Sequence, residues 1–157
     1  MIFLRQINAF FTRFWLRWFG PRWTVGCLVL LRDPQGRICL LKHRGRVRPW
    51  GLPGGLVTWP EVPEAGLRRE LAEELRWQCQ EADLPLMLVD SCVSAKFPML
   101  ELIYEAGVRV TSDTSELWVL QSSEILEVGW FDDQQIGQLE GLLDRHRSLL
   151  LKKMKQT

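Results

Sequence analysis

Three glutamates in one short segment, Glu70, Glu73 and Glu74, could together bind a cation. A row of leucines recurs every fourth residue in the same segment and predicts a helix with a buried face: Leu67, Leu71 and Leu75. At about 100° per residue, the three carboxylates lie within an arc of roughly 100° beside that face. Like charges at these spacings destabilise a helix, so the cluster needs a cation or full solvation. Carboxylate oxygens favour Mg²⁺ or Mn²⁺ over Zn²⁺.

The residues that precede this helix suit a phosphate. Gly54 and Gly55 are adjacent glycines at the end of the segment Trp50–Gly55, and they allow the backbone to come close to a ligand. Further upstream lies a basic run without an acidic residue: Lys42, Arg44, Arg46 and Arg48. Guanidinium groups are suited to phosphate oxygens that a metal leaves unneutralised. Arginines, glycines and glutamates, in this order along the chain, together predict a pyrophosphate site.

Each of these features also has an ordinary explanation. Glutamate-rich segments are often solvated helix faces, paired glycines often form tight turns, and basic runs are often solvated loops. Their order along the chain favours the functional interpretation. Arg69 is interpreted as structural, because it can hold Glu61 in a charge-assisted pair and fix the preceding loop against the helix.

The stretch from Gly55 to Trp77 resembles the signature of the Nudix hydrolases. The family pattern is Gly, five residues, Glu, seven residues, then Arg-Glu-apolar-any-Glu-Glu-any-Gly-apolar. The chain meets it at these positions: Gly55, Glu61, Arg69, Glu70, Leu71, Glu73 and Glu74. One position departs, since Arg76 stands where the family has its late glycine. The similarity extends from Trp23 to about Leu150.

The resemblance implies an α/β fold, namely an α/β/α sandwich with a mixed sheet, and hydrolysis of a nucleoside diphosphate linked to another group. It implies a Mg²⁺ or Mn²⁺ cofactor held by Glu70, Glu73, Glu74 and the carbonyl of Gly54. The groups expected to contact the substrate are Arg44, Arg46, Arg48, Gly54 and Gly55. In many relatives a base or an extra ligand lies outside the motif. Glu124 is the first candidate for that role and Glu127 the second.

The substrate stays open at this point. No accessory pattern typical of the NADH, coenzyme A or diadenosine polyphosphate branches is present, which leaves ADP-ribose-like nucleotide sugars and nucleoside triphosphates. The alternative is a catalytically silent Nudix-fold module that binds nucleotides or other molecules. Loss of motif acids would indicate such a module, and none of the core acids is lost. Trp50 and Trp59 are read either as base-stacking residues or as ordinary packing aromatics.

The hydrophobic pattern predicts the remaining elements. Strands are expected over Thr24–Leu31, 37–42, 84–93, 100–110 and Ile125–Phe131, with a turn over 33–36 and a helix from about Asp133 to Lys153. With 157 residues and a net charge of +1, the chain fits a single domain with no general affinity for nucleic acid. The four cysteines lack CxxC spacing and no export signal precedes them, so reduced thiols and a cytoplasmic location are expected.

The first residues are treated separately from the domain, which is expected over 21–157. Residues 1–20 carry apolar side chains along one side of a projected helix and arginines along the other, which predicts an amphipathic helix. The segment is too short and too charged to span a membrane. Two interpretations remain open for residues 1–19. The segment packs on the domain or on a second subunit in a homodimer, or it makes peripheral contact with an anionic membrane.

Overall fold

A computed structural model describes residues 23–75, 87–93, 98–107 and 123–156. Its strands are β1 (Thr24–Arg32), β2 (Ile38–His43), β3 (Trp50–Gly51), β4 (Gly54–Leu56), β5 (Met87–Val93), β6 (Met99–Gly107) and β7 (Ile125–Phe131). Its helices are α2 (Pro63–Leu75), α3 (Asp133–Gln138) and α4 (Asp144–Met154). The amphipathic helix predicted for residues 1–20 lies outside the described residues, as does the departure at Arg76. None of the described helices is both long and apolar enough to cross a membrane.

The strands form one mixed sheet of seven, in the order β3-β2-β1-β6-β5, with β4 paired to β1 and β7 paired to β2. β1 and β6 run parallel from Thr24 opposite Met99 to Arg32 opposite Gly107, and the other described pairs are antiparallel. Successive side chains of a strand point to opposite faces. β1 therefore supplies both faces of the sheet with apolar side chains, as its run of buried residues indicates.

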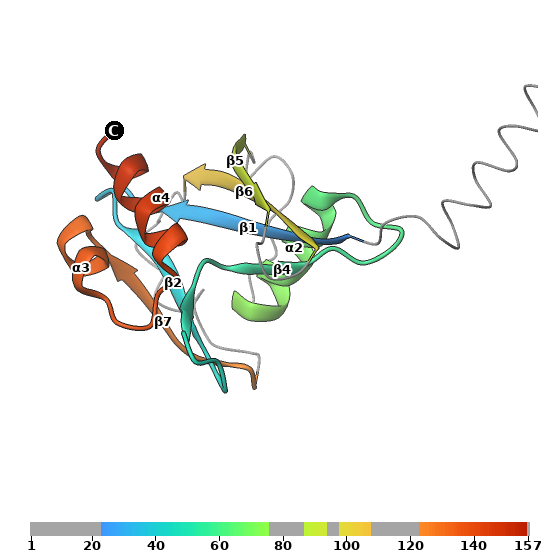
Figure 1. Cartoon of the computed structure of the whole chain (residues 1–157), viewed down its shortest axis with the longest axis horizontal. Helices are drawn as coiled ribbons and strands as arrows, with labels where there is room; N and C mark the ends of the chain where they lie inside the picture. The colour runs from blue at the N-terminus through green and yellow to red at the C-terminus, as the bar shows by residue number, and fades with distance from the viewer. Residues whose placement is uncertain (1–22, 76–86, 94–97, 108–122, 157) are drawn as a thin grey trace, which may run out of the picture.

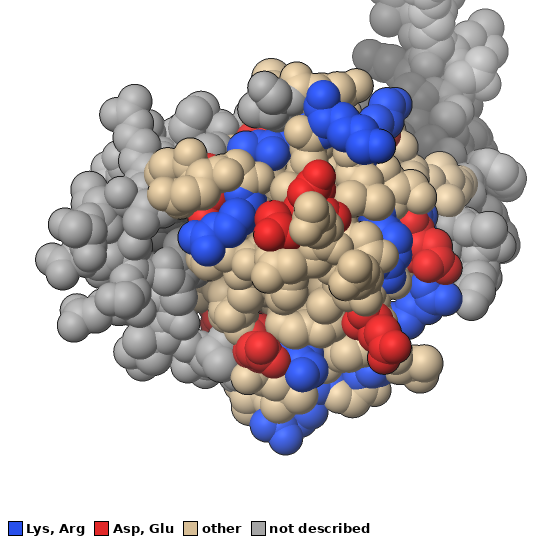
Figure 2. Space-filling model, turned by 90° about the vertical axis from the view of Figure 1, so that its left-hand side faces the viewer, with Lys and Arg blue, Asp and Glu red and all other residues tan. Residues whose placement is uncertain are grey.

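The sheet separates two hydrophobic clusters and two helical layers (Figure 1). On one face, Cys27 and Val29 pack with the leucine row of α2. On the other face, Leu30 packs with Ile136 of α3 and Leu150 of α4. The α/β/α sandwich with a mixed sheet is therefore confirmed. The face that carries α3 and α4 displays basic and acidic side chains side by side (Figure 2).

Most predicted strands match the observed ones, and β7 matches at both ends. β1 extends one residue beyond its predicted end, and β2 is shifted by one residue. The predicted strands over 84–93 and 100–110 each extend into residues outside the described part. Within the described part, β5 (Met87–Val93) and β6 (Met99–Gly107) match them. The segment Trp50–Gly55 contains two short strands, β3 and β4, where the sequence indicated only a glycine turn. Cys27, Cys39 and Cys92 are free thiols, as expected.

The single helix predicted from Asp133 to Lys153 is wrong. Two helices occupy this range, because the chain leaves α3 after Gln138 and turns through Gly141, whose φ of 77° favours glycine. The guanidinium of Arg147 donates hydrogen bonds to carbonyl oxygens at the end of α3: those of Ile136, Gly137 and Leu139. These carbonyls would accept bonds from residues 140, 141 and 143 in a continuous helix. Arg147 therefore satisfies the end of α3 and holds it beside α4.

The leucine face of α2 should carry much of the stability of this layer. Leu71 is fully buried, and Leu71→Ala should lower the free energy of unfolding by about 2–5 kcal/mol, because it removes apolar contacts and leaves a cavity. Val47 is 98% exposed, so Val47→Ala is the matched control and should change stability by about 0.5 kcal/mol or less. Urea unfolding followed by circular dichroism measures both. Equal unfolding midpoints for the two variants would contradict the packing described for α2.

Candidate active site

Arg69 joins the loop before α2 to the acidic side of the helix. Its Nε and Nη2 donate to the two carboxylate oxygens of Glu61 at 3.2 and 2.9 Å. Its Nη1 donates to Glu70 at 2.9 Å and to Glu73 at 3.4 Å, and Nη2 also donates to the carbonyl oxygen of Leu56 at 2.9 Å. The pair between Arg69 and Glu61 is the one that the sequence predicted. One guanidinium thus fixes β4, the loop and the helix relative to one another.

Glu61 is bound from a second side by Thr58. The backbone N–H and the hydroxyl of Thr58 both donate to Glu61 Oε1, at 2.7 and 2.8 Å. The hydrogen bond from Arg69, followed by those from Thr58, lowers the pKa of Glu61 to about 2. Thr58 was not predicted from the sequence, since it lies in the loop before α2 and carries no motif position. Glu61 is therefore a fixed anion that closes the loop onto α2.

Glu74 is the buried carboxylate of the cluster, with 8% of its surface exposed. Its Oε2 accepts a hydrogen bond from the backbone N–H of Gly54 at 2.8 Å. Burial raises the pKa of Glu74 to about 8, against the hydrogen bond from Gly54. The carboxylates of Glu70 and Glu124 raise it further, while Arg46 opposes them. Residues from α2, β4, the basic run and the segment before β7 thus converge on one buried carboxylate.

The two adjacent glycines are required by close packing on both sides. Gly54 has a φ of 121°, and a side chain there would overlap the carbonyl oxygen of Cys27 on β1. A Cβ on Gly55 would lie 2.6 and 2.7 Å from the two carboxylate oxygens of Glu70. The glycines therefore let α2 place its carboxylates directly against the backbone of β4.

The structure brings the predicted metal ligands to one side of α2, but their oxygens are engaged by the protein itself. Glu70 and Glu73 face Arg69, while Glu74 faces the N–H of Gly54. Within the part of the chain that the structure describes, no three His, Cys, Asp or Glu side chains are arranged to hold a metal. The donor set is nevertheless of the type that Mg²⁺ and Mn²⁺ prefer, and a cation beside the buried Glu74 would offset the repulsion from the partly exposed Glu70 and the exposed Glu73. These residues fit a hard divalent cation.

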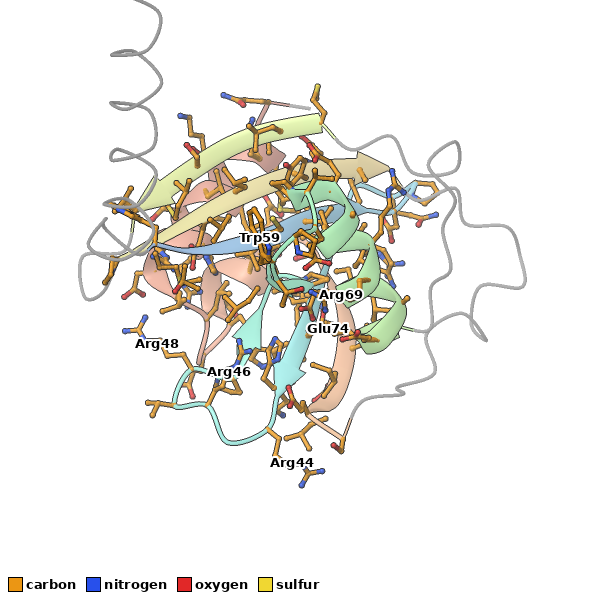
Figure 3. All side chains as sticks on the ribbon, turned by 90° about the vertical axis from the view of Figure 1, so that its right-hand side faces the viewer. Arg44, Arg46, Arg48, Trp59, Arg69 and Glu74 are labelled. Carbon is orange, nitrogen blue, oxygen red and sulfur yellow. The ribbon has the colours of Figure 1, made fainter. Side chains whose placement is uncertain are left out.

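The basic run separates into different environments (Figure 3). Arg44 points away from the body of the protein, and its Nε donates to the carbonyl oxygen of Ser123 at 3.0 Å. Arg48 binds Asp144 at the start of α4 at 2.9 Å. Arg46 lies nearest to the glutamates, as its effect on the pKa of Glu74 indicates. Of the three arginines, Arg46 is the one that the structure brings to the buried carboxylate.

Glu124 lines a cavity of about 520 Å³ together with His43 and Arg46, and its charge acts on Glu74. The Nε2 of His43 is buried and has no hydrogen-bond partner among the described residues. The sequence analysis assigned no role to His43. Glu127 lies elsewhere, because it pairs with Lys42 at 3.1 Å, and Lys42 contacts the ring of Trp50 on the opposite face of the sheet. The geometry thus favours Glu124 over Glu127.

The two tryptophans near the site differ in exposure. Trp50 is buried and meets Phe131 edge to face at 5.0 Å, so its ring serves in packing. Trp59 is 97% exposed at the loop between β4 and α2. Figure 3 labels its indole together with Arg69 and Glu74. Trp59 is therefore the tryptophan that is accessible to a ligand.

Solved structures share this fold. The MutT protein from Methanosarcina mazei Go1 is 20% identical, with a TM-score of 0.65 over 88% of this chain and 96% of that one. The Escherichia coli dihydroneopterin triphosphate pyrophosphohydrolase is 16% identical, with a TM-score of 0.65 over 87% and 100% of the two chains. The NUDIX domain of Shewanella oneidensis NrtR, solved with ADP ribose, is 16% identical, with a TM-score of 0.67 over 92% and 98%.

A search by sequence among curated proteins gave no match. Because the solved structures above are at most 20% identical to this chain, they show its fold alone. Sequence assigns the family, because the model of the NUDIX domain matches residues 20–152, most of the chain. That range contains the loop, helix α2 and the Arg69 contacts described above, and the chain therefore belongs to the NUDIX domain family.

Proposed function

We propose that this protein is a hydrolase that uses Mg²⁺ or Mn²⁺ to cleave a pyrophosphate linkage in a nucleoside diphosphate linked to another group. The observation that carries the proposal is the convergence of α2 carboxylates on the Gly54–Gly55 backbone, with Glu74 buried against the N–H of Gly54. The family supports a pyrophosphohydrolase. The similar structures include a pyrophosphohydrolase and a domain with bound ADP ribose, which supports a nucleotide substrate.

Glu70, Glu73 and Glu74 would hold the cation, together with the carbonyl oxygen of Gly54. Such a cation neutralises charge on phosphate oxygens and makes a bound water more acidic. Arg69 and Glu61 would keep the loop and the helix in place, so the backbone that carries the carboxylates is held before the cation binds.

The other residues act on the substrate and on water. Arg46 would bind a phosphate oxygen, with Arg44 and Arg48 at the margins of the basic run. The backbone of Gly54 and Gly55 lets the pyrophosphate approach β4 closely. Glu124, in the cavity beside Glu74, would accept the proton of the attacking water. ADP-ribose-like nucleotide sugars and nucleoside triphosphates are the substrates proposed.

Hydrolysis should require a divalent cation and the motif carboxylates. The purified protein should release a phosphate-containing product from a panel of nucleoside diphosphate derivatives with magnesium or manganese, and none with EDTA. Glu73→Gln and Glu74→Gln should each lower kcat by about 100-fold or more, because each removes a charged ligand. Circular dichroism should show an intact fold in both variants. Wild-type rates in both would contradict the metal assignment, and a panel without any turnover would favour a silent binding module.

Glu124→Gln should separate a base from a metal ligand. If Glu124 deprotonates water, the variant should lose about 100-fold or more in kcat while its affinity for Mn²⁺, measured by calorimetry, stays within about twofold. Glu127→Gln is the matched control, because Glu127 belongs to the same segment but pairs with Lys42 on the other face. Weakened Mn²⁺ binding by Glu124→Gln would assign Glu124 as a ligand. An active Glu124→Gln beside an inactive Glu127→Gln would move the base to Glu127.

Gly55→Ala should disable the site without unfolding the domain. The new Cβ would meet the carboxylate of Glu70, so this side chain must leave its place beside β4 and kcat should fall by at least about tenfold. Gly137→Ala in α3 is the control, since a Cβ there meets no atom within 4 Å. Turnover and thermal unfolding are measured on both. Unchanged kcat in Gly55→Ala would show that contact between Glu70 and β4 is not needed for the reaction.

A further inference from the structure

The face of the sheet that α2 covers extends beyond that helix. α2 packs mainly on β1 and β4, whereas β6 and β5 continue the sheet on the other side of β1 (Figure 1). The first turn of α2 reaches β6, where the hydroxyl of Tyr104 donates to Glu64 at 3.0 Å. Helices α3 and α4 pack on the opposite face. Among the described residues, no helix therefore lies over the rest of β6 and β5 on the face of α2.

This uncovered part of the sheet carries apolar side chains. Leu102 and Tyr104 of β6 pack in the cluster beneath α2, and Leu100 points to the same side because it is two residues from Leu102. Leu88 of β5 is opposite Tyr104, and Val93 is opposite Leu100. Residues that lie opposite each other in a ladder share a face. We call this surface the β5–β6 face, and it consists of Leu88, Val93, Leu100 and Leu102.

The β5–β6 face is open to solvent although it is apolar. Leu88 is 53% exposed and Val93 is 58% exposed, while Leu100 and Leu102 are half-buried. Between the two exposed residues of β5, Ser91 adds only a small hydroxyl group. The solvated face of an antiparallel sheet usually carries polar side chains. The composition of this face is therefore that of a surface that another part of a protein covers.

The chain enters the domain at one end of the β5–β6 face. β1 begins beside the start of β6, where the backbone N–H of Thr24 donates to the carbonyl oxygen of Pro98 at 2.9 Å. Val93 and Leu100 form the pair of β5 and β6 nearest to this end. Trp23 is 50% exposed and immediately precedes β1. Residues 1–22 thus join the domain next to an exposed apolar surface.

Residues 1–19 have the length and the pattern to cover this face. The helix predicted for them is about 28 Å long, and the seven residues of β5 span about 23 Å. Gly20 and Pro21 follow, and such a pair ends helices and favours turns, so the chain can reverse direction before Trp23. The apolar side chains of the predicted helix share an arc of roughly 140°. They are Phe3, Leu4, Ile7, Phe10, Phe11, Phe14, Trp15 and Trp18.

Connection and charge favour this segment of the same chain over other occupants. Only residues 20–22 separate the predicted helix from Trp23, so its effective concentration at its own domain is on the order of millimolar, above that of a second copy. Glu64 and Arg68 lie one turn apart on the side of α2 that faces β6, and their charges are opposite. This border has no positive excess, which an anionic membrane would require.

We propose that residues 1–19 fold back as an amphipathic helix and pack on the β5–β6 face of the same chain. The apolar arc would contact Leu88, Val93 and Leu100, while the arginines of the segment stay in solvent. β5 and β6 lie on the side of β1 away from β4, so the docked helix leaves the glutamates near Gly54 uncovered. The inference is independent of the proposed hydrolysis.

Limited digestion of the full-length protein with trypsin tests this docking, because a packed helix is cleaved only after it opens. Mass spectrometry follows cleavage after Arg17. Val93→Glu puts a charge on the β5–β6 face and should speed this cleavage by at least about tenfold. Leu126→Glu is the matched control, because Leu126 is an exposed apolar residue of β7 on the other side of β1, and it should change the rate by less than about twofold. Within the segment, Phe11→Glu should act like Val93→Glu, and Asn8→Glu on the polar side should act like the control.

Each other outcome would overturn the proposal. A wild-type protein that is cleaved as fast as Phe11→Glu has no docked helix. Protection that survives Val93→Glu would place the helix elsewhere, and Leu88→Glu replaces that variant if circular dichroism shows that it does not fold. Protection that is lost on dilution, together with a change from dimer to monomer in light scattering, would assign the face to a second copy. Protection that appears only with vesicles containing phosphatidylserine would assign the segment to a membrane.

Discussion

The site depends on the guanidinium of Arg69, because it connects three parts of the chain through one side chain. Its contacts reach the backbone of β4 through Leu56, the loop through Glu61, and α2 through Glu70 and Glu73. Five N–H groups in a rigid plane can satisfy such a set of acceptors, whereas the three donors of a lysine ammonium cannot. The carboxylates of Glu70 and Glu73 are therefore held by Arg69, a residue that has no proposed part in the reaction itself.

The close packing of β4 adds a second constraint, since β4 pairs with β1 and faces α2. Gly54 and Gly55 contact α2 on one face and line a cavity of about 560 Å³ on the other. A side chain at Gly54 would meet β1, and one at Gly55 would meet Glu70. The same two residues thus lie between a buried carboxylate and a cavity, which is the position proposed for the pyrophosphate. Arg46 lies in the loop before β3 and lines both this cavity and the cavity that contains Glu124.

Local sequence patterns predicted the features that depend on residues close together in the sequence. The leucine row identified α2, the apolar run identified β1, the hydrophobic pattern identified β7, and the motif residues predicted the pair between Arg69 and Glu61. The break between α3 and α4 was missed because Arg147, which satisfies the end of α3, acts from the following helix. Gly141 was the available signal, since glycine commonly ends helices.

Contacts between distant residues had no signal at all. Glu101 and His146 are 45 positions apart, and only the pairing of β6 with β1 and the packing of α4 bring them to one cavity. The basic run shows the converse error, because three arginines at alternate positions suggested one shared role. Their partners separate them: Arg44 bonds to Ser123, Arg48 pairs with Asp144, and Arg46 acts on Glu74.

The balance of charge around Glu74 links these observations. Burial and the neighbouring carboxylates of Glu70 and Glu124 disfavour its ionised form, and the Gly54 N–H with Arg46 offsets only part of that effect. A protein without use for a cation would gain stability from an apolar residue at this position. The fold instead holds Glu74 ionisable beside glycines that admit a phosphate and close to Glu124. A buried acid with a raised pKa is typical of a functional site, and it is one of the observations that support the proposed divalent cation.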